Sequence, residues 1–296
     1  MELKANHLSK NYRKFRAVDD FSYTFHEGVY GLLGVNGAGK TTLMRMLTTL
    51  LNPSSGSITW DGEDIFRMDE QYRKLLGYLP QDFGYYPDFS VNDYLMYIAI
   101  LKGIKPTVAK RRVQEVLKQV GLQKARKKKM KTLSGGMLRR AGIAQAILNN
   151  PKILILDEPT AGLDPSERIR FRNVISELAE NRMVLLSTHI VSDVASIANE
   201  ILLLKNGNLV ASGTVSQLVE SAQDKAWICV CNKAQANSLG KKYRVANVRN
   251  TPHGVELRVI SKEVPMEGAV LTDTTLEDVF LSCMGERSGD NSYDSV

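Results

Sequence analysis

Short runs of hydrophobic residues alternate with segments of helical spacing along most of the chain. Runs of strand length, nearly continuous in apolar residues, occur at Val29–Leu33, Ile153–Leu156, Met183–Ser187 and Ile201–Leu204. Between and after them, apolar residues recur at helical spacing over Thr41–Leu51, Pro165–Glu180 and Ser192–Asn199. Buried parallel strands are apolar on both faces and need helical crossovers, so this alternation predicts an α/β fold with a mainly parallel sheet.

Two regions depart from this pattern. Near the N-terminus, Leu3–Leu8 and Phe21–Phe25 alternate apolar and polar positions, and Ser57–Trp60 reads as a further strand before the turn at Asp61. From Ser90 to Lys131 the character changes to helix, with helical apolar spacing over Val91–Leu101 and Val108–Val120. A helical segment therefore interrupts the strand-and-helix alternation.

A second domain is predicted beyond a boundary near Thr214–Asp224. Its expected strands and helix are Trp227–Cys231, Tyr243–Val248, Val255–Ile260 and a helix to Met284. Thr274 and Glu277 have the spacing of a capping box at the start of that helix. The polar end, 286–296, is predicted to be disordered.

Charge and composition add little to this picture. The formal net charge is +7, and most basic residues are interleaved with carboxylates, as on a solvated surface. The exception is Lys124–Lys131, which lacks aromatic residues and is interpreted as a solvated face or a partner contact, not as a nucleic-acid site. No run approaches the ~18–20 apolar residues of a membrane helix. Cys229 and Cys231 are expected to be buried apolar residues, because two cysteines are too few for a metal site.

The strongest chemical signal follows the first apolar run. Gly34, Gly39, Lys40 and Thr41 have the spacing of a phosphate-binding loop between a strand and a helix. Glycines let backbone N–H groups surround phosphates, the lysine reaches the β- and γ-phosphates, and the threonine hydroxyl is suited to Mg²⁺. The loop predicts binding of ATP with Mg²⁺ through these positions: Asn36, Gly37, Ala38, Gly39, Lys40, Thr41 and Thr42.

Two carboxylates follow the second apolar run. Asp157 and Glu158 come directly after Ile153–Leu156, at the end of a predicted buried strand. Asp157 is suited to bind Mg²⁺ through water, and Glu158 to polarise the water that attacks the γ-phosphate. Alone, such a pair is often only a strand reaching solvent, but downstream of a phosphate loop the catalytic interpretation is favoured.

The segment Leu133-Ser134-Gly135-Gly136-Met137 completes a pattern that resembles the nucleotide-binding subunit of ATP-binding cassette (ABC) transporters. The resemblance covers about Leu3 to Val219. It implies a P-loop NTPase fold over residues 1–219: a mainly parallel sheet, a small antiparallel β part and a helical subdomain at about 90–140. A small α+β C-terminal domain would occupy 220–285.

The same resemblance implies roles for individual residues. Ser134, Gly135 and Gly136 would bind the γ-phosphate held by an opposite subunit, so that two ATP molecules lie sandwiched in a head-to-tail dimer. Family members commonly have Gln at the position of Met137, and a methionine cannot supply that amide's hydrogen bonds. Gln81 would contact Mg²⁺ and the attacking water, and Asp164 would lie in a loop that crosses the dimer interface. His189 would act as a switch that contacts the γ-phosphate and Glu158. Tyr12 would stack on adenine, with Phe15 as the alternative.

Partners are implied in the same way. The helical subdomain and the Gln81 loop would form a groove for a separate transmembrane permease, with Tyr85, Tyr86, Pro87 and Phe89 contributing apolar surface or packing in the core. The chain would then lie at the cytoplasmic face of the membrane and dimerise with an identical or related ATPase. Thr274–Leu281 resembles a segment common in exporters of drugs, antibiotics and peptides, or is an ordinary amphipathic helix.

Other function classes fit the sequence less well. A soluble ABC ATPase acting on ribosomes or nucleic acid typically carries two cassettes or a long coiled-coil insertion, and neither is present in the sequence. A P-loop GTPase would carry an Asn-Lys-x-Asp motif, which the sequence lacks. A catalytically inactive binding module is disfavoured because Lys40, Asp157, Glu158 and His189 are all present. By the same resemblance, the permease and not this chain would recognise the transported substrate.

Overall fold

The computed structural model describes residues 1–13, 15–252 and 254–285. The chain forms two compact units, Met1–Leu209 and a second that begins at Val210. This division falls earlier in the chain than the expected boundary at Val219. The tail expected to be disordered, 286–296, lies outside the described residues.

The first unit is built around a sheet of order β10-β9-β3-β8-β7-β6, whose edge strand β10 begins in this unit and continues past the division at Leu209. The pairs β3–β8, β3–β9, β7–β8 and β6–β7 are parallel, which confirms the predicted α/β architecture. Its strands are β3 (Gly28–Leu33), β6 (Leu76–Leu79), β7 (Ile153–Leu156), β8 (Met183–Thr188), β9 (Glu200–Lys205) and β10 (Asn208–Gly213).

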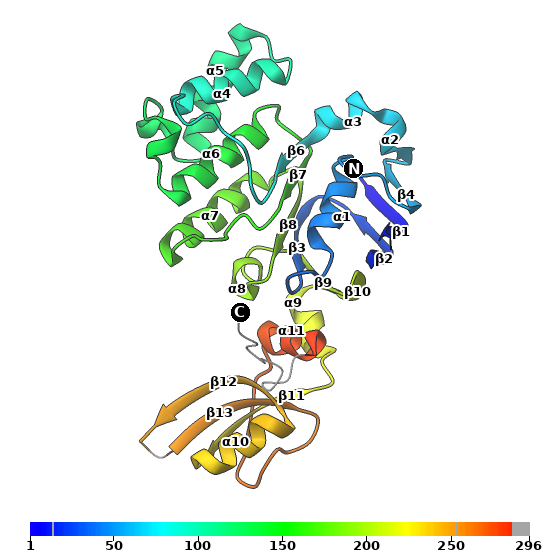
Figure 1. Ribbon diagram of the computed structural model, residues 1–296, viewed down its shortest axis with the longest axis vertical. Helices are drawn as coiled ribbons and strands as arrows, with labels where there is room; N and C mark the ends of the chain where they lie inside the picture. The colour runs from blue at the N-terminus through cyan, green and yellow to red at the C-terminus, as the bar shows by residue number, and fades with distance from the viewer. Residues whose placement is uncertain (14, 253, 286–296) are drawn as a thin grey trace. The chain divides into compact units, whose positions relative to one another are not determined.

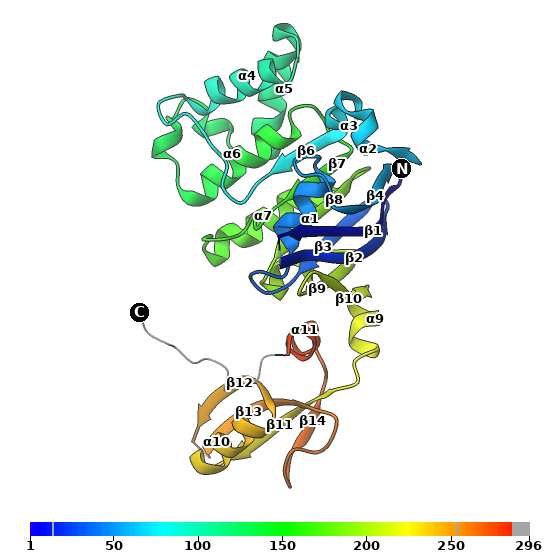
Figure 2. The same ribbon diagram turned by 45° about the vertical axis from the view of Figure 1, so that its right-hand side comes forward.

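A four-stranded antiparallel sheet of order β2-β1-β4-β5 lies beside this sheet (Figure 2). Its strands are β1 (Leu3–Tyr12), β2 (Phe15–Phe25), β4 (Ser55–Trp60) and β5 (Glu63–Asp64). Helix α1 (Lys40–Leu47) packs between the two sheets, since Leu43 and Met44 share one apolar core with Phe21 of β2 and Leu185 of β8. This core fixes the loop that leads into α1.

Most of the remaining helices of the first unit gather beside β6 (Figure 1). Helix α6 approaches β6 so closely that a Cβ at Gly142 would lie 2.7 Å from Leu79. The helices of this unit are α2 (Ile65–Met68), α3 (Glu70–Leu75), α4 (Val91–Leu101), α5 (Pro106–Gln119), α6 (Gly135–Ile147), α7 (Pro165–Leu178) and α8 (Val191–Val194), with short 3₁₀ turns at Gln123–Ala125 and Met130–Thr132.

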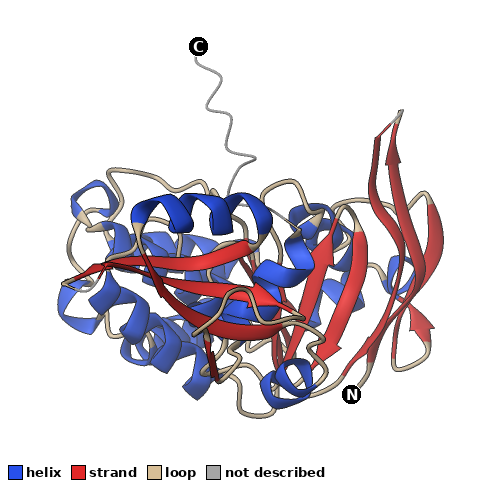
Figure 3. Cartoon of the chain, turned by 90° about the horizontal axis from the view of Figure 1, so that it is seen from below, coloured by secondary structure: helices blue, strands red, loops and turns tan. Residues whose placement is uncertain are grey.

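The second unit contains a four-stranded antiparallel sheet of order β12-β13-β11-β14, drawn in red in Figure 3. Cys229 and Cys231 are buried on the face that packs against Leu239 of α10, as expected for apolar cysteines. Its elements are α9 (Val215–Glu220), β11 (Lys225–Cys231), α10 (Lys233–Lys242), β12 (Arg244–Thr251), β13 (Gly254–Ser261), β14 (Val270–Thr272) and α11 (Leu276–Met284).

Two sequence-based predictions of local structure were wrong. The helix expected over Ser192–Asn199 is the single turn α8, because the chain must return at once to β9. The cap of α11 is Thr275, not Thr274: its hydroxyl accepts the Asp278 N–H, and the Asp278 carboxylate accepts the Thr275 N–H. Four helices, α2, α3, α9 and α10, and three strands, β5, β10 and β14, have apolar patterns too short to be predicted from residue spacing.

Candidate functional site

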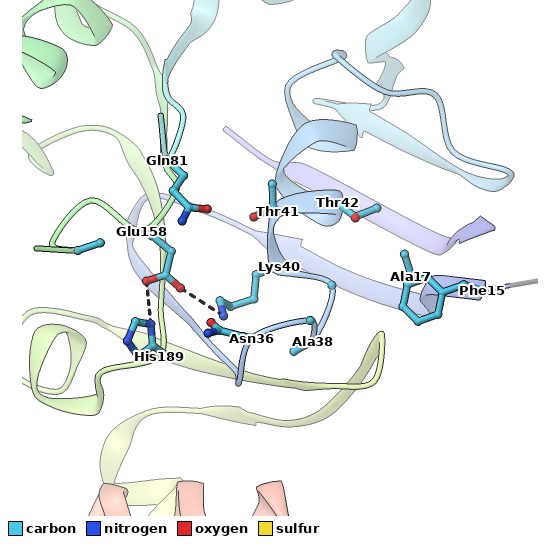
Figure 4. Close-up of a pocket in the computed structure, with 13 residues that line it drawn as sticks. Phe15, Ala17, Asn36, Ala38, Lys40, Thr41, Thr42, Gln81, Glu158 and His189 are labelled. Atoms are coloured by element: carbon cyan, nitrogen blue, oxygen red, sulfur yellow. Dashed lines mark hydrogen bonds and ion pairs between the residues drawn. The ribbon is translucent and has the colours of Figure 1, made fainter. Parts of the chain in front are cut away.

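The loop after β3 lies at the floor of a cavity of about 480 Å³ in the first unit. Gly39 adopts a left-handed conformation with φ of 101°, and a Cβ there would lie 2.3 Å from the Ala17 carbonyl oxygen. Any other residue would therefore be strained and would clash with β2. Besides Gly39, the cavity is lined by Phe15, Ala17, Asn36, Gly37, Ala38, Lys40, Thr41, Thr42, Gln81, Glu158, Ala161 and His189 (Figure 4).

A buried ion pair lies at the centre of this cavity. The Lys40 ammonium is 3.3 Å from Glu158 Oε1 and donates to the carbonyl oxygens of Gly34 and Val35 at 2.7 and 3.2 Å. On the other side, Glu158 Oε2 is 3.1 Å from His189 Nδ1. The carboxylate thus bridges a lysine from the glycine loop and a histidine from the end of β8 (Figure 4). The lysine is more than a hundred positions away from the other two along the chain, and the parallel sheet brings them together.

The backbone around Glu158 is held in an uncommon conformation. Glu158 has φ of 45°, a value that L-residues adopt rarely and that is concentrated at functional sites. Its N–H donates to Ser187 Oγ at 2.8 Å, and the Ser187 hydroxyl donates to Asp157 Oδ1 at 2.7 Å. Ser187 therefore fixes both carboxylate residues from the neighbouring strand. Sequence reasoning missed Ser187, although a serine within an apolar strand is a detectable signal.

Asp157 is fully buried, and its Oδ2 has no hydrogen-bond partner among the described residues. An unpartnered buried carboxylate oxygen is costly, so a site of this kind fits a cation or its bound water. Nearby, burial and the negative charge of Asp157 raise the pKa of Tyr78 to about 12, which keeps that phenol neutral. Thr41 and Gln81 line the cavity, whereas Asp157 is buried next to Glu158 and is not part of the lining. Together the three residues offer hydroxyl, amide and carboxylate oxygens, the ligands that Mg²⁺ prefers. No cluster of three or more His, Cys, Asp and Glu side chains within the described residues forms an alternative metal site.

Not all predicted site residues line the cavity. Phe15 lines it and Tyr12 does not, although the two are paired across the β1–β2 hairpin. Phe15 is 61% exposed and Tyr12 45%, so exposure alone does not distinguish them. The structure brings Phe15, and not Tyr12, to the cavity lining.

The signature segment also lies outside the cavity lining, as does Asp164. Ser134 caps α6, accepting the Met137 N–H at 3.3 Å, and lies at the exposed start of that helix. Asp164 likewise caps α7 and is exposed, and the Glu167 N–H and the Ser166 hydroxyl lower its pKa. In one chain, therefore, the glycine loop and the signature segment do not share a cavity.

The signature segment and the start of α7 are joined through a buried arginine. Arg140 is 7% exposed and lies 3.3 Å from Glu167 Oε2, while Glu167 N–H donates to Asp164 at 2.9 Å. A Cβ at Gly136 would approach the same Oε2 to 2.4 Å. A side chain at Gly136 would therefore displace Glu167 from its pair with Arg140.

A second buried contact links the loops that follow β7 and β8. The Thr160 hydroxyl donates to Asp193 Oδ2 at 2.5 Å, and both residues are almost completely buried. Asp193 lies on α8, shortly after His189, and Thr160 begins the loop that leads to Asp164. The pair was not identified from the sequence, since nothing in the spacing of these polar residues shows that they meet.

Comparisons with known proteins place this arrangement in a family. The model of the family described as ABC transporter matches residues 18–161. The uncharacterized ABC transporter ATP-binding protein YxlF of Bacillus subtilis (strain 168) is 36% identical over 252 residues, 84% of each chain. The linearmycin resistance ATP-binding protein LnrL of the same strain is 35% identical, covering 73% of this chain and 70% of that protein. Nod factor export ATP-binding protein I of Cupriavidus pinatubonensis (strain JMP 134 / LMG 1197) is 36% identical, covering 74% and 68%.

Solved structures agree with the sequence relatives. A structure described as the ATP binding subunit of an ABC transporter has a TM-score of 0.66 and 26% identity, covering 74% of this chain and 92% of that one. That of cbiO1 from Clostridium perfringens, described as part of the ABC transporter complex cbiONQ, has a TM-score of 0.66 and 28% identity, covering 72% and 88%. The chain therefore belongs to the ATP-binding proteins of ABC transporters. It is an ATPase of that family, as the sequence motifs predict.

Proposed function

We propose that this chain is the ATP-hydrolysing subunit of an exporter, acting as a dimer that drives a separate transmembrane permease. The observation that carries the proposal is the separation of the glycine loop from the exposed signature segment. A chain with two anion-binding elements that do not share a cavity is suited to complete its site with a second copy.

In this proposal the glycine loop and Lys40 bind the ATP phosphates, and Phe15 stacks on the adenine. Thr41, Gln81 and Asp157 hold Mg²⁺, which would neutralise phosphate charge and orient the γ-phosphate when bound. The unpartnered Asp157 Oδ2 and the oxygen donors of the set support this assignment.

Glu158 has two functions in turn. Its carboxylate pairs with Lys40, at a separation of 3.3 Å. When the lysine turns to phosphate, Glu158 is released to polarise the attacking water, and His189 at 3.1 Å holds the carboxylate in position. The same carboxylate therefore pairs with Lys40 and serves as the base.

The signature residues Ser134, Gly135 and Gly136 act on the nucleotide of the other subunit. Ser134 Oγ accepts the Met137 N–H, so its hydroxyl hydrogen remains available to donate to a phosphate oxygen. Met137 contributes only backbone at this position. Asp164, joined to the same helix through Glu167 and Arg140, is assigned in this proposal to a loop at the dimer interface.

The permease is proposed to dock beside the Gln81 loop. Tyr86 is 48% exposed, stacks on Phe89 at 5.0 Å between ring centroids and meets Tyr97 edge-on at 5.2 Å. Such a cluster gives a helix from a partner a preformed apolar contact. In the described part of the chain no helix is long and apolar enough to span a membrane. The path for substrate is assigned to another subunit in this proposal.

Export as the direction is supported by relatives whose names refer to linearmycin resistance and Nod factor export. Purification of the tagged chain from solubilised membranes tests the proposal. We expect a multi-span membrane protein to be recovered in a fixed ratio with the chain. Recovery with ribosomes, and without a membrane protein, would contradict it and would favour a soluble ABC ATPase.

A further inference from the structure

The positive charge of the protein is concentrated in the helical region between Ser90 and Lys131. This segment holds twelve lysines and arginines but only two acidic residues, Asp93 and Glu115. Because the whole chain has a formal net charge of only +7, the remainder is net acidic. An excess of positive charge of this size on one part of a chain favours binding to an anionic partner.

Six of the basic residues form one stretch, Lys124–Lys131, that we call the basic loop. All six side chains are exposed: Lys124, Arg126, Lys127, Lys128, Lys129 and Lys131. Asp88 approaches two of them, Lys129 at 3.6 Å and Lys131 at 2.6 Å, and these lysines lower its pKa. Within the described residues, Lys124, Lys127 and Lys128 form no ion pair, so their charge is uncompensated.

Arg126 and Lys127 also line a hollow beside the first turn of α4. Its other lining residues are polar: Ser90, Asn92, Asp93 and Gln114. The Arg126 guanidinium donates to Gln114 Oε1 at 3.4 Å, and the Asp93 carboxylate accepts the Ser90 hydroxyl at 2.7 Å. Amide and hydroxyl groups therefore stand next to the uncompensated cations, as in a surface that accepts a hydrated anionic group.

The basic loop is fixed to the surface proposed to receive the permease. Its backbone bonds to the segment just before α4: Met130 N–H donates to the Phe89 carbonyl at 2.9 Å, and Lys131 N–H donates to the Pro87 carbonyl at 3.0 Å. Phe89 stacks on Tyr86 of the aromatic cluster. If that cluster contacts a membrane protein, the basic loop lies on the same side of the chain, near the membrane.

The chemistry of that environment distinguishes two anionic partners. Cytoplasmic loops of membrane proteins carry an excess of lysine and arginine, so a permease loop would repel the basic loop. The cytoplasmic leaflet carries anionic lipids and attracts clusters of basic residues. We propose that the basic loop binds the anionic headgroups of the membrane next to the permease. The proposal rests on the proposed function only in placing the chain beside a permease.

Binding of the purified full-length chain to lipid vesicles tests this. Vesicles of phosphatidylcholine with phosphatidylglycerol are compared with phosphatidylcholine alone, by sedimentation at low and high salt. Each basic residue near an anionic bilayer adds about fivefold to affinity. We therefore expect binding to the anionic vesicles only, weakening with salt, and at least a tenfold loss for Lys127→Glu/Lys128→Glu.

The matched control is Lys241→Glu/Lys242→Glu in α10, which changes the net charge equally and is expected to bind as the unaltered chain does. Equal binding by both double variants, or binding to phosphatidylcholine alone, would overturn the proposal. So would binding to polyglutamate or RNA without binding to vesicles. MgATP binding and thermal unfolding of the Lys127/Lys128 variant should stay unchanged. Failure of the unaltered chain to bind MgATP would contradict the proposed function and not the lipid surface.

Discussion

Replacing Glu158 by Gln removes one negative charge from the cavity while keeping the size of the side chain. In the structure this carboxylate lies 3.3 Å from the Lys40 ammonium, and the two side chains are only 9% and 6% exposed. At an effective dielectric constant of about 20, the gross attraction at that distance is about 5 kcal/mol. Phosphate must compete with this attraction before Lys40 can bind it.

The neutral carboxamide of the variant would leave Lys40 free and would not repel the γ-phosphate. We expect Glu158→Gln to bind MgATP at least tenfold more tightly, because part of the attraction of about 5 kcal/mol no longer opposes binding. Turnover should fall by about 10²–10⁴, because a carboxamide cannot accept the proton of the attacking water. The variant should gain affinity for MgATP and lose turnover, whereas a damaged fold would lower both.

The assays are phosphate release at saturating ATP and titration with a fluorescent ATP analogue. Glu180→Gln, at an exposed position after α7, is the matched control and should leave both quantities unchanged. Turnover of Glu158→Gln within tenfold of the unaltered chain would refute the role of Glu158 in polarising water. Weaker MgATP binding would refute the competition for Lys40.

Three further predictions concern other parts of the chain. His189→Ala should reduce turnover by about 10²-fold while changing MgATP affinity by less than about threefold; unchanged turnover would contradict its switch role. Thr160→Val should lower the free energy of unfolding by about 3 kcal/mol, because it leaves the buried Asp193 carboxylate without its hydrogen-bond donor, whereas Thr160→Ser, which keeps the hydroxyl and loses one buried methyl group, should cost only about 1 kcal/mol in thermal unfolding. Asp278, 2% exposed, accepts Arg258 Nε at 2.9 Å, and Asp278→Ala should destabilise the second unit by about 3 kcal/mol in hydrogen exchange. Although burial opposes it, bonding from Arg258 and Thr275 lowers the pKa of Asp278, so this stabilisation should be present above about pH 4 and be lost as pH falls through the lower folded pKa.

Much of the site could be predicted because its chemistry is local in sequence. The glycine loop, the carboxylates after β7 and the histidine after β8 each follow an apolar strand, and parallel strands present such residues at one edge of the sheet. The strand Ile153–Leu156 was predicted with the bounds that the structure shows. The contact of Glu158 with both Lys40 and His189 follows from that common edge.

What could not be predicted depends on which side chains meet in three dimensions. Phe15 and Tyr12 are equally aromatic, and only the hairpin geometry places Phe15 in the cavity lining. Ser187 and the Thr160–Asp193 pair are ordinary polar residues until the neighbouring strands position them. Short helices such as α2 and α10 depend on packing more than on spacing, so their patterns were too weak to detect.

In the proposed dimer each ATP is bound by the glycine loop of one subunit and the signature segment of the other. Two inactive variants test it when mixed: Lys40→Ala, which lacks a working loop, and Ser134→Arg, which lacks a working signature. In a two-fold sandwich each mixed dimer contains one intact site, so the mixture should regain up to about a quarter of the turnover of the unaltered chain. If both variants are folded and the mixture stays as inactive as each alone, the site is not shared between subunits and the account is contradicted.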